Sequence, residues 1–332
     1  MGRVSKKIKI GLTYDLRDDY LKEGYGSEET AEFDLPDTIH AIEKVILDNG
    51  FQSDRIGNIK ALTRRLAKGD CWDLVFNIAE GMHGFGREAQ VPALLEAYNI
   101  PYTFSDPLGN ALTLHKGFTK QILRDLGIPT PDFFVVHDVN DIDKINLPFP
   151  LFAKPVAEGT GKGITSLSKI NTRKNLHKVC KQLLKTFQQP VLVETYLPGR
   201  EFTVGILGTG KDARALGVLE VLLKPNAEKN AYSYENKEHY DKLVEYVLVN
   251  DDEAQKAMEI SLMAWRGLDL KDAGRIDLRS NVHGIPHFME VNSLAGLNPV
   301  RSDLPILCSK IGMSYHKLIS AILKSALKRV KK

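Results

Sequence analysis

The sequence of 332 residues has only three cysteines, Cys71, Cys180 and Cys308, which lie far apart and form no CxxC motif. This sparse use argues against a disulfide scaffold and indicates a reduced, cytoplasmic protein. No apolar run approaches the roughly 20 residues of a membrane-spanning helix, and the charged opening MGRVSKKIKI has no apolar signal core behind it. We therefore expect neither a membrane partner nor a secretory signal.

An excess of charge and several informative motifs are also missing. The formal net charge is only +3, and the one basic cluster is the final KSALKRVKK, so we expect no nucleic-acid partner. No GxGxxG follows the first predicted strand, which argues against a dinucleotide-binding domain. Neither GxSxG nor HExxH occurs, and the nine histidines are scattered. A hydrolase built on a nucleophile is therefore not favoured.

The chain has the composition of a globular protein, with 43% hydrophobic and 26% charged residues, and its length predicts two or three packed units. We place them at residues 1–106, 107–190 and 191–332. The first unit alternates strands at 7–14 and 73–78 with helices at 38–49, from Asn58 and at 88–98, which predicts a parallel sheet covered by helices. Ligands bind at the carboxyl edge of such sheets, where Glu80, His83, Arg87 and Glu88 follow the second strand.

The remaining units mix strands and helices. We expect helices at 113–126, 172–187 and 252–267 and from Ser314, with strands at 133–136, 151–154, 163–168, 190–194, 201–207 and 216–222. The polar stretch Pro225–Lys242 is too long for a tight turn, and such loops within compact domains are often lids.

A hairpin at residues 272–292 carries the clearest chemical pattern. Alternating runs flank His283-Gly284, which predicts two strands joined by a two-residue turn. That turn places Asp277 opposite Glu290 and Arg275 opposite Asn292, all on one face. Facing carboxylates repel each other, and a cation between them removes the repulsion; oxygen ligands favour Mg²⁺ or Mn²⁺. The alternative is an exposed polar face on an edge hairpin.

Two further stretches have the chemistry of a nucleotide site. Lys154-Pro155 precedes the glycine-rich Glu158–Gly163 (EGTGKG), whose backbone amides could approach phosphate oxygens; the alternative is a mobile hairpin tip. Residues 191–201 (VLVETYLPGRE) offer apolar walls, backbone hydrogen-bonding groups and a carboxylate, as adenine and ribose require. The alternative there is an ordinary linker between domains.

Taken in order, Lys116, Lys154 with EGTGKG, VLVETYLPGRE and GRID…MEVN resemble the ATP-grasp ligases, and most nearly the D-alanine–D-alanine ligases, over nearly the whole chain. The resemblance implies an α/β ATP-grasp fold of three α/β domains, with a parallel-sheet N-terminal domain and nucleotide between the central and C-terminal domains. It implies ATP and two Mg²⁺ (or Mn²⁺) ions, and it is compatible with a homodimer.

The resemblance also implies roles for individual residues. Lys116 and Lys154 would hold ATP phosphates, together with Glu158, Gly159, Thr160, Gly161, Lys162 and Gly163. Glu194, Tyr196 and Leu197 would border adenine, and Glu201 would bind ribose. Asp277, Glu290 and Asn292 would hold the metal ions, Arg275 would stabilise an oxyanion, and Lys237 would lie on a closing loop.

The amino-acid pockets depart from the family pattern. Glu80, Glu238 and Asp303 stand where the dipeptide ligases have His, Tyr and Leu, and Thr160 replaces a serine. Glu32 and Glu80 are candidates to hold a substrate ammonium. The reaction expected is ATP-dependent ligation of amino-acid or peptide substrates through an acyl phosphate, with D-alanine a poor substrate and a polar or cationic amino acid a better one. The alternative is a catalytically silent ATP-binding regulator or scaffold.

Overall fold

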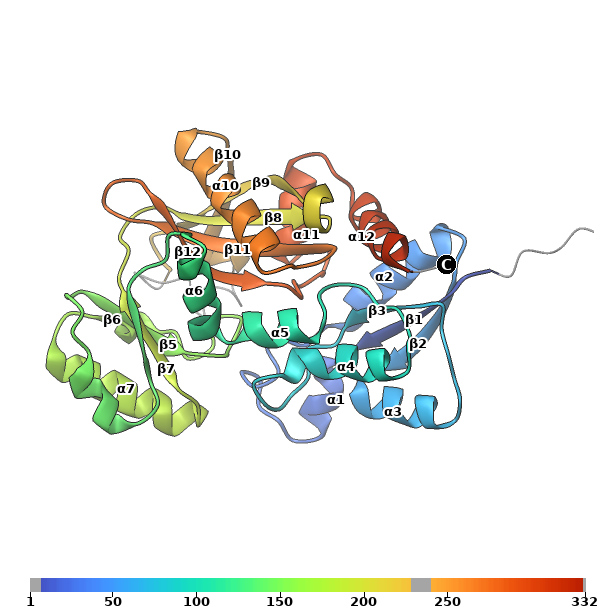
Figure 1. The fold of residues 1–332 in the computed structure, drawn as a ribbon, viewed down its shortest axis with the longest axis horizontal. Helices are drawn as coiled ribbons and strands as arrows, with labels where there is room; N and C mark the ends of the chain where they lie inside the picture. The colour runs from blue at the N-terminus through green and yellow to red at the C-terminus, as the bar shows by residue number, and fades with distance from the viewer. Residues whose placement is uncertain (1–6, 228–239, 331–332) are drawn as a thin grey trace, which may run out of the picture.

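The computed structural model describes residues 7–227 and 240–330, which form three sheets with helices packed around them (Figure 1). Most of the predicted lid, including Lys237 and Glu238, lies outside the described residues. Within the described ranges, no helix is long and apolar enough to span a membrane.

The first sheet is parallel, as predicted, with strand order β2-β1-β3. Its strands are β1 (Lys9–Tyr14), β2 (Gln52–Gly57) and β3 (Leu74–Ile78). Its helices are α2 (Pro36–Asp48), α3 (Ile59–Ala67) and α4 (Gln90–Ala97), the last preceded by the 3-10 turn η1 (Arg87–Ala89). Strand β2 was missed because its sequence, QSDRIG, is polar and lies at the sheet edge. The expected loop 15–37 contains a short helix, α1 (Arg17–Lys22).

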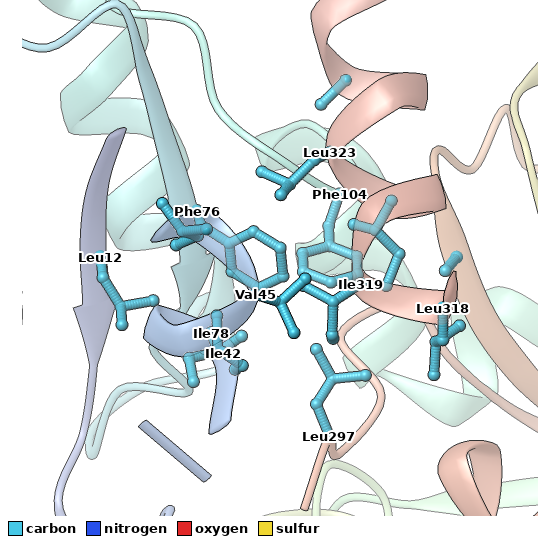
Figure 2. Packing of buried hydrophobic residues seen from close by; sticks show 14 of the residues in the cluster. Leu12, Ile42, Val45, Phe76, Ile78, Phe104, Leu297, Leu318, Ile319 and Leu323 are labelled. Atoms are coloured by element: carbon cyan, nitrogen blue, oxygen red, sulfur yellow. The ribbon is translucent and has the colours of Figure 1, made fainter. Parts of the chain in front are cut away.

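The last helix, α12 (Tyr315–Arg329), packs against this first sheet and joins the two ends of the chain. Figure 2 shows Leu318, Ile319 and Leu323 of α12 in one buried cluster with Phe76 and Phe104. Burial of such large apolar side chains stabilises each by roughly 1.5–3 kcal/mol. The N-terminal and C-terminal units therefore share one core.

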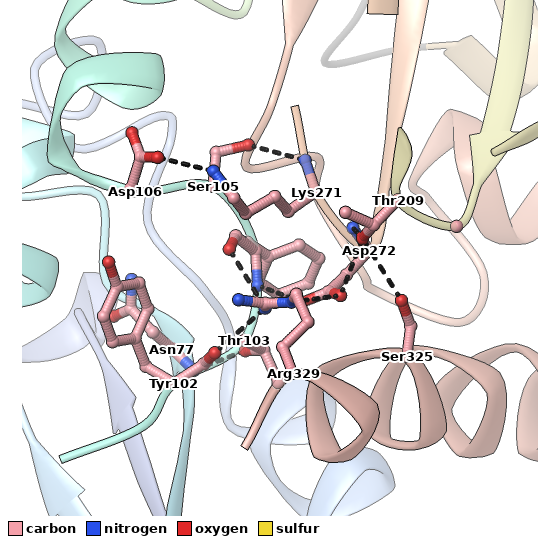
Figure 3. A network of polar contacts seen from close by, with 12 residues as sticks. Asn77, Tyr102, Thr103, Ser105, Asp106, Thr209, Lys271, Asp272, Ser325 and Arg329 are labelled. Atoms are coloured by element: carbon pink, nitrogen blue, oxygen red, sulfur yellow. Dashed lines mark hydrogen bonds and ion pairs between the residues drawn. The ribbon is translucent and has the colours of Figure 1, made fainter. Parts of the chain in front are cut away.

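A buried polar network reinforces that contact (Figure 3). The Asp272 carboxylate is fully buried; it accepts a hydrogen bond of 2.7 Å from the backbone N–H of Phe104 and pairs with the Arg329 guanidinium at 2.5 Å. Arg329 also donates to the carbonyl oxygens of Tyr102 and Phe104. One carboxylate thus ties α12, the segment after β3 and the start of β11 together.

The second unit holds an antiparallel sheet of order β4-β7-β5-β6. Its strands are β4 (Phe133–Val136), β5 (Leu151–Pro155), β6 (Lys169–Ile170) and β7 (Val191–Thr195). Helix α7 (Arg173–Phe187) covers it, with the turns η2 (Val139–Lys144) and η3 (Ser166–Ser168). Strand β7 therefore belongs to this sheet and not, as predicted, to the third unit.

Two predicted elements of the second unit differ in the structure. The helix expected at 113–126 is divided at His115 into α5 (Pro107–Leu114) and α6 (Lys116–Asp125), because the His115 side chain caps α6 by accepting from the N–H of Phe118. The strand expected at 163–168 is absent. Gly163 has a φ of +72°, and Thr165 caps η3, so this stretch turns and does not extend.

The third sheet is antiparallel, with order β10-β9-β8-β11-β12. Its strands are β8 (Glu201–Leu207), β9 (Arg214–Leu223), β10 (Val244–Val249), β11 (Ala273–Ser280) and β12 (Pro286–Asn292). The turn η4 (Gly210–Asp212), α9 (Tyr240–Leu243), α10 (Asp252–Gly267) and α11 (Asp303–Lys310) complete it.

The predicted hairpin register is confirmed at the two polar pairs: Asp277 pairs with Glu290 and Arg275 with Asn292. The predicted two-residue turn is wrong, because the strands end at Ser280 and Pro286 and a longer loop joins them. An irregularity after Asp277 shifts the register by one residue and so restores the pairing that the shorter turn would have produced.

Candidate active site

Two cavities meet between the three units. The first, the sheet cavity, lies between β5 of the second unit and β8, β11 and β12 of the third, and has a volume of about 80 Å³. The second, the junction cavity, has a volume of about 240 Å³ and is lined by all three units. Lys116 and Glu290 line both cavities, so these two side chains mark the place where the cavities join.

The sheet cavity collects most of the residues predicted to hold nucleotide. Tyr196, Leu197 and Glu201 line it, together with Phe152 and Met289. The polar lining residues predicted from sequence are Lys116, Lys154, Glu158, Gly161, Lys162, Asp277 and Glu290. An apolar end beside a cluster of lysines is the arrangement that a base and its phosphates require.

Three charged side chains are locked together where the cavities join. The Glu290 carboxylate lies 3.6 Å from the Lys116 ammonium and 3.5 Å from that of Lys154. Burial lowers the pKa of Lys116 despite the nearby Glu290. Burial alone would also lower the pKa of Lys154, but Glu194 and Glu290 outweigh it and raise the pKa. Lys154 is therefore held as a fixed positive charge.

Glu194 does not lie where the sequence placed it. We expected it to border adenine, but it lines neither cavity and its side chain has no exposed surface. Its carboxylate pairs with Lys154 at 3.4 Å and with Lys120, which sequence reasoning missed, at 3.1 Å. Burial would raise the pKa of Glu194, but the two lysines lower it. Glu194 thus pairs with Lys154 from outside the cavity that Lys154 lines.

The hairpin carboxylates are compatible with a metal site. Asp277 accepts a hydrogen bond of 2.8 Å from the Thr203 hydroxyl and pairs with Arg275, and the Asn292 amide lies 3.5 Å away. No cluster of three or more His, Cys, Asp or Glu side chains in the described ranges is arranged as a metal site. Two carboxylates and one amide oxygen are nonetheless donors that suit Mg²⁺, which commonly takes its other ligands from water and phosphate.

The glycine-rich loop is tied to the first unit by ion pairs. Glu32 accepts a hydrogen bond of 2.6 Å from the Gly159 N–H and pairs with Lys162 at 2.9 Å and Arg87 at 3.2 Å. Arg87 also donates to the Ala157 carbonyl at 2.9 Å. Although burial would raise the pKa of Glu32, Lys162 and Arg87 lower it to about 2. Glu32 is thus a permanent anion whose oxygens are occupied by the protein itself.

The junction cavity contains the other predicted residues. Glu32, Glu80, Gly159, Thr160, Arg275 and Asn292 line it, whereas Gly163 lines neither cavity. Asp303, expected near a substrate site, also lines it: its carboxylate lies 3.5 Å from the Arg275 guanidinium and accepts a hydrogen bond of 2.7 Å from Tyr246. Asp277, Asp303 and Glu290 raise the pKa of Arg275, which burial would lower.

Sequence reasoning assigned no role to several acids and bases of the junction cavity, namely Arg17, Asp34, Glu88 and Arg301. Burial and the neighbouring acid Asp15 raise the pKa of Asp34 to about 8. Burial also raises the pKa of Glu88, to about 7, against the opposing effect of Arg87. The pKa of Glu80 is raised well above its usual range by burial and by Glu88. Glu88 could have been found from the sequence, because it follows the second predicted strand and so lies at the edge where such sheets bind ligands.

These features define a class of protein. A cavity enclosed between two antiparallel sheets is typical of the ATP-grasp fold, and solved structures of similar architecture match nearly the whole chain. One is D-alanine–D-alanine ligase from Bacillus anthracis complexed with ATP, with a TM-score of 0.72, 22% identity, and coverage of 97% of this chain and 98% of that chain. Another is the VanG D-Ala:D-Ser ligase from Enterococcus faecalis, with a TM-score of 0.73, 20% identity, and coverage of 97% and 100%.

The sequence comparisons narrow the class to a family. Residues 122–324 match the family model described as D-ala D-ala ligase C-terminus. The chain is 38% identical over 248 residues to a D-alanine–D-alanine ligase of Aquifex aeolicus, covering 73% of this chain and 79% of the relative. It is 32% identical over 251 residues to one of Bordetella avium, covering 74% and 76%. The chain therefore belongs to the D-alanine–D-alanine ligase family and is an ATP-dependent C–N ligase.

Proposed function

We propose that this ligase joins two amino-acid-like substrates by an amide bond, through an acyl phosphate. The observation that carries the proposal is that Lys116 and Glu290 line both cavities. Nucleotide in the sheet cavity would present its terminal phosphate there, and a carboxylate in the junction cavity would lie next to it. Fixing the two reactants in this way supplies much of the rate enhancement in phosphoryl transfer.

The proposed chemistry has two steps. A carboxylate oxygen of the first substrate attacks the γ-phosphorus of ATP, forming an acyl phosphate and releasing ADP. The amine of the second substrate then attacks the acyl carbon, and phosphate leaves as the amide forms. Arg275, buried at the cavity wall, would stabilise the negative oxygen that develops on that carbon. Lys116 and Lys154 would neutralise the phosphates.

Asp277, Glu290 and Asn292 would hold Mg²⁺ or Mn²⁺, and we propose two ions. A bound divalent ion would neutralise the phosphate charge in the reaction. In the described structure Arg275, Lys116 and Lys154 pair with these carboxylates. When nucleotide enters, these cations would pair with the phosphates, which would free the carboxylates to hold the metal ions.

The names of the relatives suggest D-alanine as a substrate, and we treat it as one candidate among amino acids. A silent ATP-binding role is not favoured, because the residues proposed for catalysis, Arg275, Asp277 and Glu290, are all present and lie at the cavities. We also propose a cytoplasmic location, since the three cysteines are free and two of them are buried.

The test is phosphate release from ATP and Mg²⁺ with a panel of amino acids in both enantiomers. We expect release to require an amino acid and to be accompanied by an amide product. Phosphate release that no amino acid increases, in a protein that binds ATP, would support the silent alternative.

A further inference from the structure

The first unit contributes four acidic side chains to the junction cavity: Glu32, Asp34, Glu80 and Glu88. They differ in whether other residues of the protein form hydrogen bonds or ion pairs with their carboxylates. Both oxygens of Glu32 are taken by Gly159, Lys162 and Arg87. In contrast, neither the Glu80 nor the Glu88 carboxylate has a hydrogen bond or an ion pair to any of the described residues. Both face an open cavity without a partner.

The acids that the third unit contributes to this cavity have cations of their own. Glu290 lies between Lys116 and Lys154, and Asp303 lies against Arg275. Asp34 has no ion pair among the described residues and is near-neutral because of its raised pKa. Glu80 and Glu88 are therefore acids of this cavity whose charged forms the described residues do not compensate, and a bound cation would favour those charged forms.

The chain elements that begin after β12 carry groups of the opposite kind. Arg301 lines the cavity beside Ser302 and Asn298, and no ion pair to Arg301 occurs within the described ranges. A cationic and hydrogen-bonding wall of this sort suits a substrate carboxylate. The cavity thus offers carboxyl groups on the first unit, which also contributes Arg17, and the cation Arg301 on the third, as a bound amino acid would require.

A neutral amino acid satisfies only part of this arrangement. It brings one ammonium group, which can pair with one carboxylate, and leaves the other buried acid without a partner, which is unfavourable. An amino acid with a second positive charge can pair with both. The cavity of about 240 Å³ is below the range of drug-sized sites, roughly 300–1,000 Å³, and is suited to a substrate of amino-acid size.

We propose that one of the two substrates is an amino acid with a cationic side chain, and that Glu80 and Glu88 select it by pairing with its positive groups. This rests on the proposed function, and it replaces Glu32 by Glu88 as the partner of Glu80 in holding the substrate. Glu32 instead positions the glycine-rich loop.

The experiment compares charged amino acids with neutral molecules of the same shape. Binding of arginine and citrulline, and of lysine and norleucine, is measured by titration calorimetry, in both enantiomers, with Mg²⁺ and a non-hydrolysable ATP analogue. We expect at least one basic amino acid to bind about tenfold or more tightly than its neutral counterpart. Glu80→Gln and Glu88→Gln should each reduce that ratio several-fold and leave affinity for the nucleotide analogue unchanged.

Glu96→Gln is the matched control, because Glu96 is an exposed acid of the same unit whose carboxylate accepts a hydrogen bond from Tyr102 outside the cavity. It should leave the ratio intact. Equal binding of charged and neutral partners by the wild type, or a ratio that persists in the Glu80→Gln/Glu88→Gln double variant, overturns the proposal. Charge-selective binding with no phosphate released from ATP would instead contradict the proposed reaction and leave the selectivity standing.

Discussion

The two cavities differ in how their charges are balanced. In the sheet cavity each hairpin carboxylate is paired inside the protein: Glu290 with two lysines and Asp277 with Arg275. In the junction cavity, Glu80 and Glu88 face open space without a partner among the described residues. A cavity whose charges are already paired is suited to one constant ligand that brings its own counter-ions, such as nucleotide with metal ions. Acidic side chains without a partner instead favour ligands that carry positive charge over those that do not. We therefore propose that the sheet cavity holds the nucleotide, and that the junction cavity selects the amino-acid substrate.

Removing Glu194 is the strongest way to disturb the sheet cavity alone. Glu194→Gln leaves the buried ammonium group of Lys120 without its anion and leaves Lys154 paired with Glu290 alone. We expect the free energy of unfolding to fall by about 3–5 kcal/mol, as when one partner of a buried pair is removed. Chemical denaturation measures it. In the Lys120→Met/Glu194→Leu pair much of the loss should be recovered, and equal losses in both variants would contradict this account.

Arg275 tests whether the reaction occurs where the cavities meet. Arg275→Lys retains the positive charge beside Asp277 and Asp303 but loses the planar fork of the guanidinium. We expect kcat to fall by about 10²–10³, as for loss of one oxyanion donor, with little change in the KM for ATP. Steady-state kinetics measures both. A raised KM for ATP with normal kcat would place Arg275 in nucleotide binding.

The Arg329 network links the first and third units, two of the three that line the junction cavity. Arg329→Met removes the cation that pairs with the buried Asp272. Because the arginine is partly exposed, we expect a loss of about 1–3 kcal/mol in unfolding free energy, below that of a fully buried pair. The KM for amino acids should rise more than the KM for ATP. Equal increases would show that the network supports both cavities alike.

The smallest expected difference between the two cavities is in how the affinity of each for its ligand changes with pH. The pKa of Glu88 is raised to about 7, so this acid is protonated below that pH and charged above it. Affinity for a basic amino acid should rise a few-fold between about pH 6 and pH 8, and nucleotide affinity should change less. Calorimetry at each pH measures this, and a flat profile would contradict it. The charged groups that act on Glu88 are Arg87, Glu32, Lys116, Lys162 and Glu80.

The hairpin of the sheet cavity could be predicted from the sequence because its pairing follows a local pattern. The alternation of apolar residues in β11 and β12 placed Asp277 opposite Glu290, and β8 and α10 have the bounds that their patterns indicate. Glu194 was misplaced because its partner Lys120 comes from a distant helix. The alternation of side chains along a strand shows which of them are buried, but it does not show that a buried carboxylate meets a lysine from another element.

The junction cavity was predicted only in part, because loops from all three units form it. Glu80 and Asp303 were identified as departures from the family pattern, and both line the cavity. The contrast between the saturated Glu32 and the unpaired Glu88 depends on Arg87 and Lys162, which come from different units. Such contacts have no counterpart in local sequence, so the roles of Glu32 and Glu88 required the structure.

The central claim is that a substrate carboxylate in the junction cavity attacks the phosphate of ATP in the sheet cavity. The most direct measurement uses an amino acid labelled with heavy oxygen in its carboxylate, chosen as the one that gives the fastest phosphate release. Mass spectrometry of the released phosphate follows the label. We predict that one labelled oxygen appears in each phosphate formed during ligation. Unlabelled phosphate, released together with the amide product, would contradict an acyl phosphate and the account built on it.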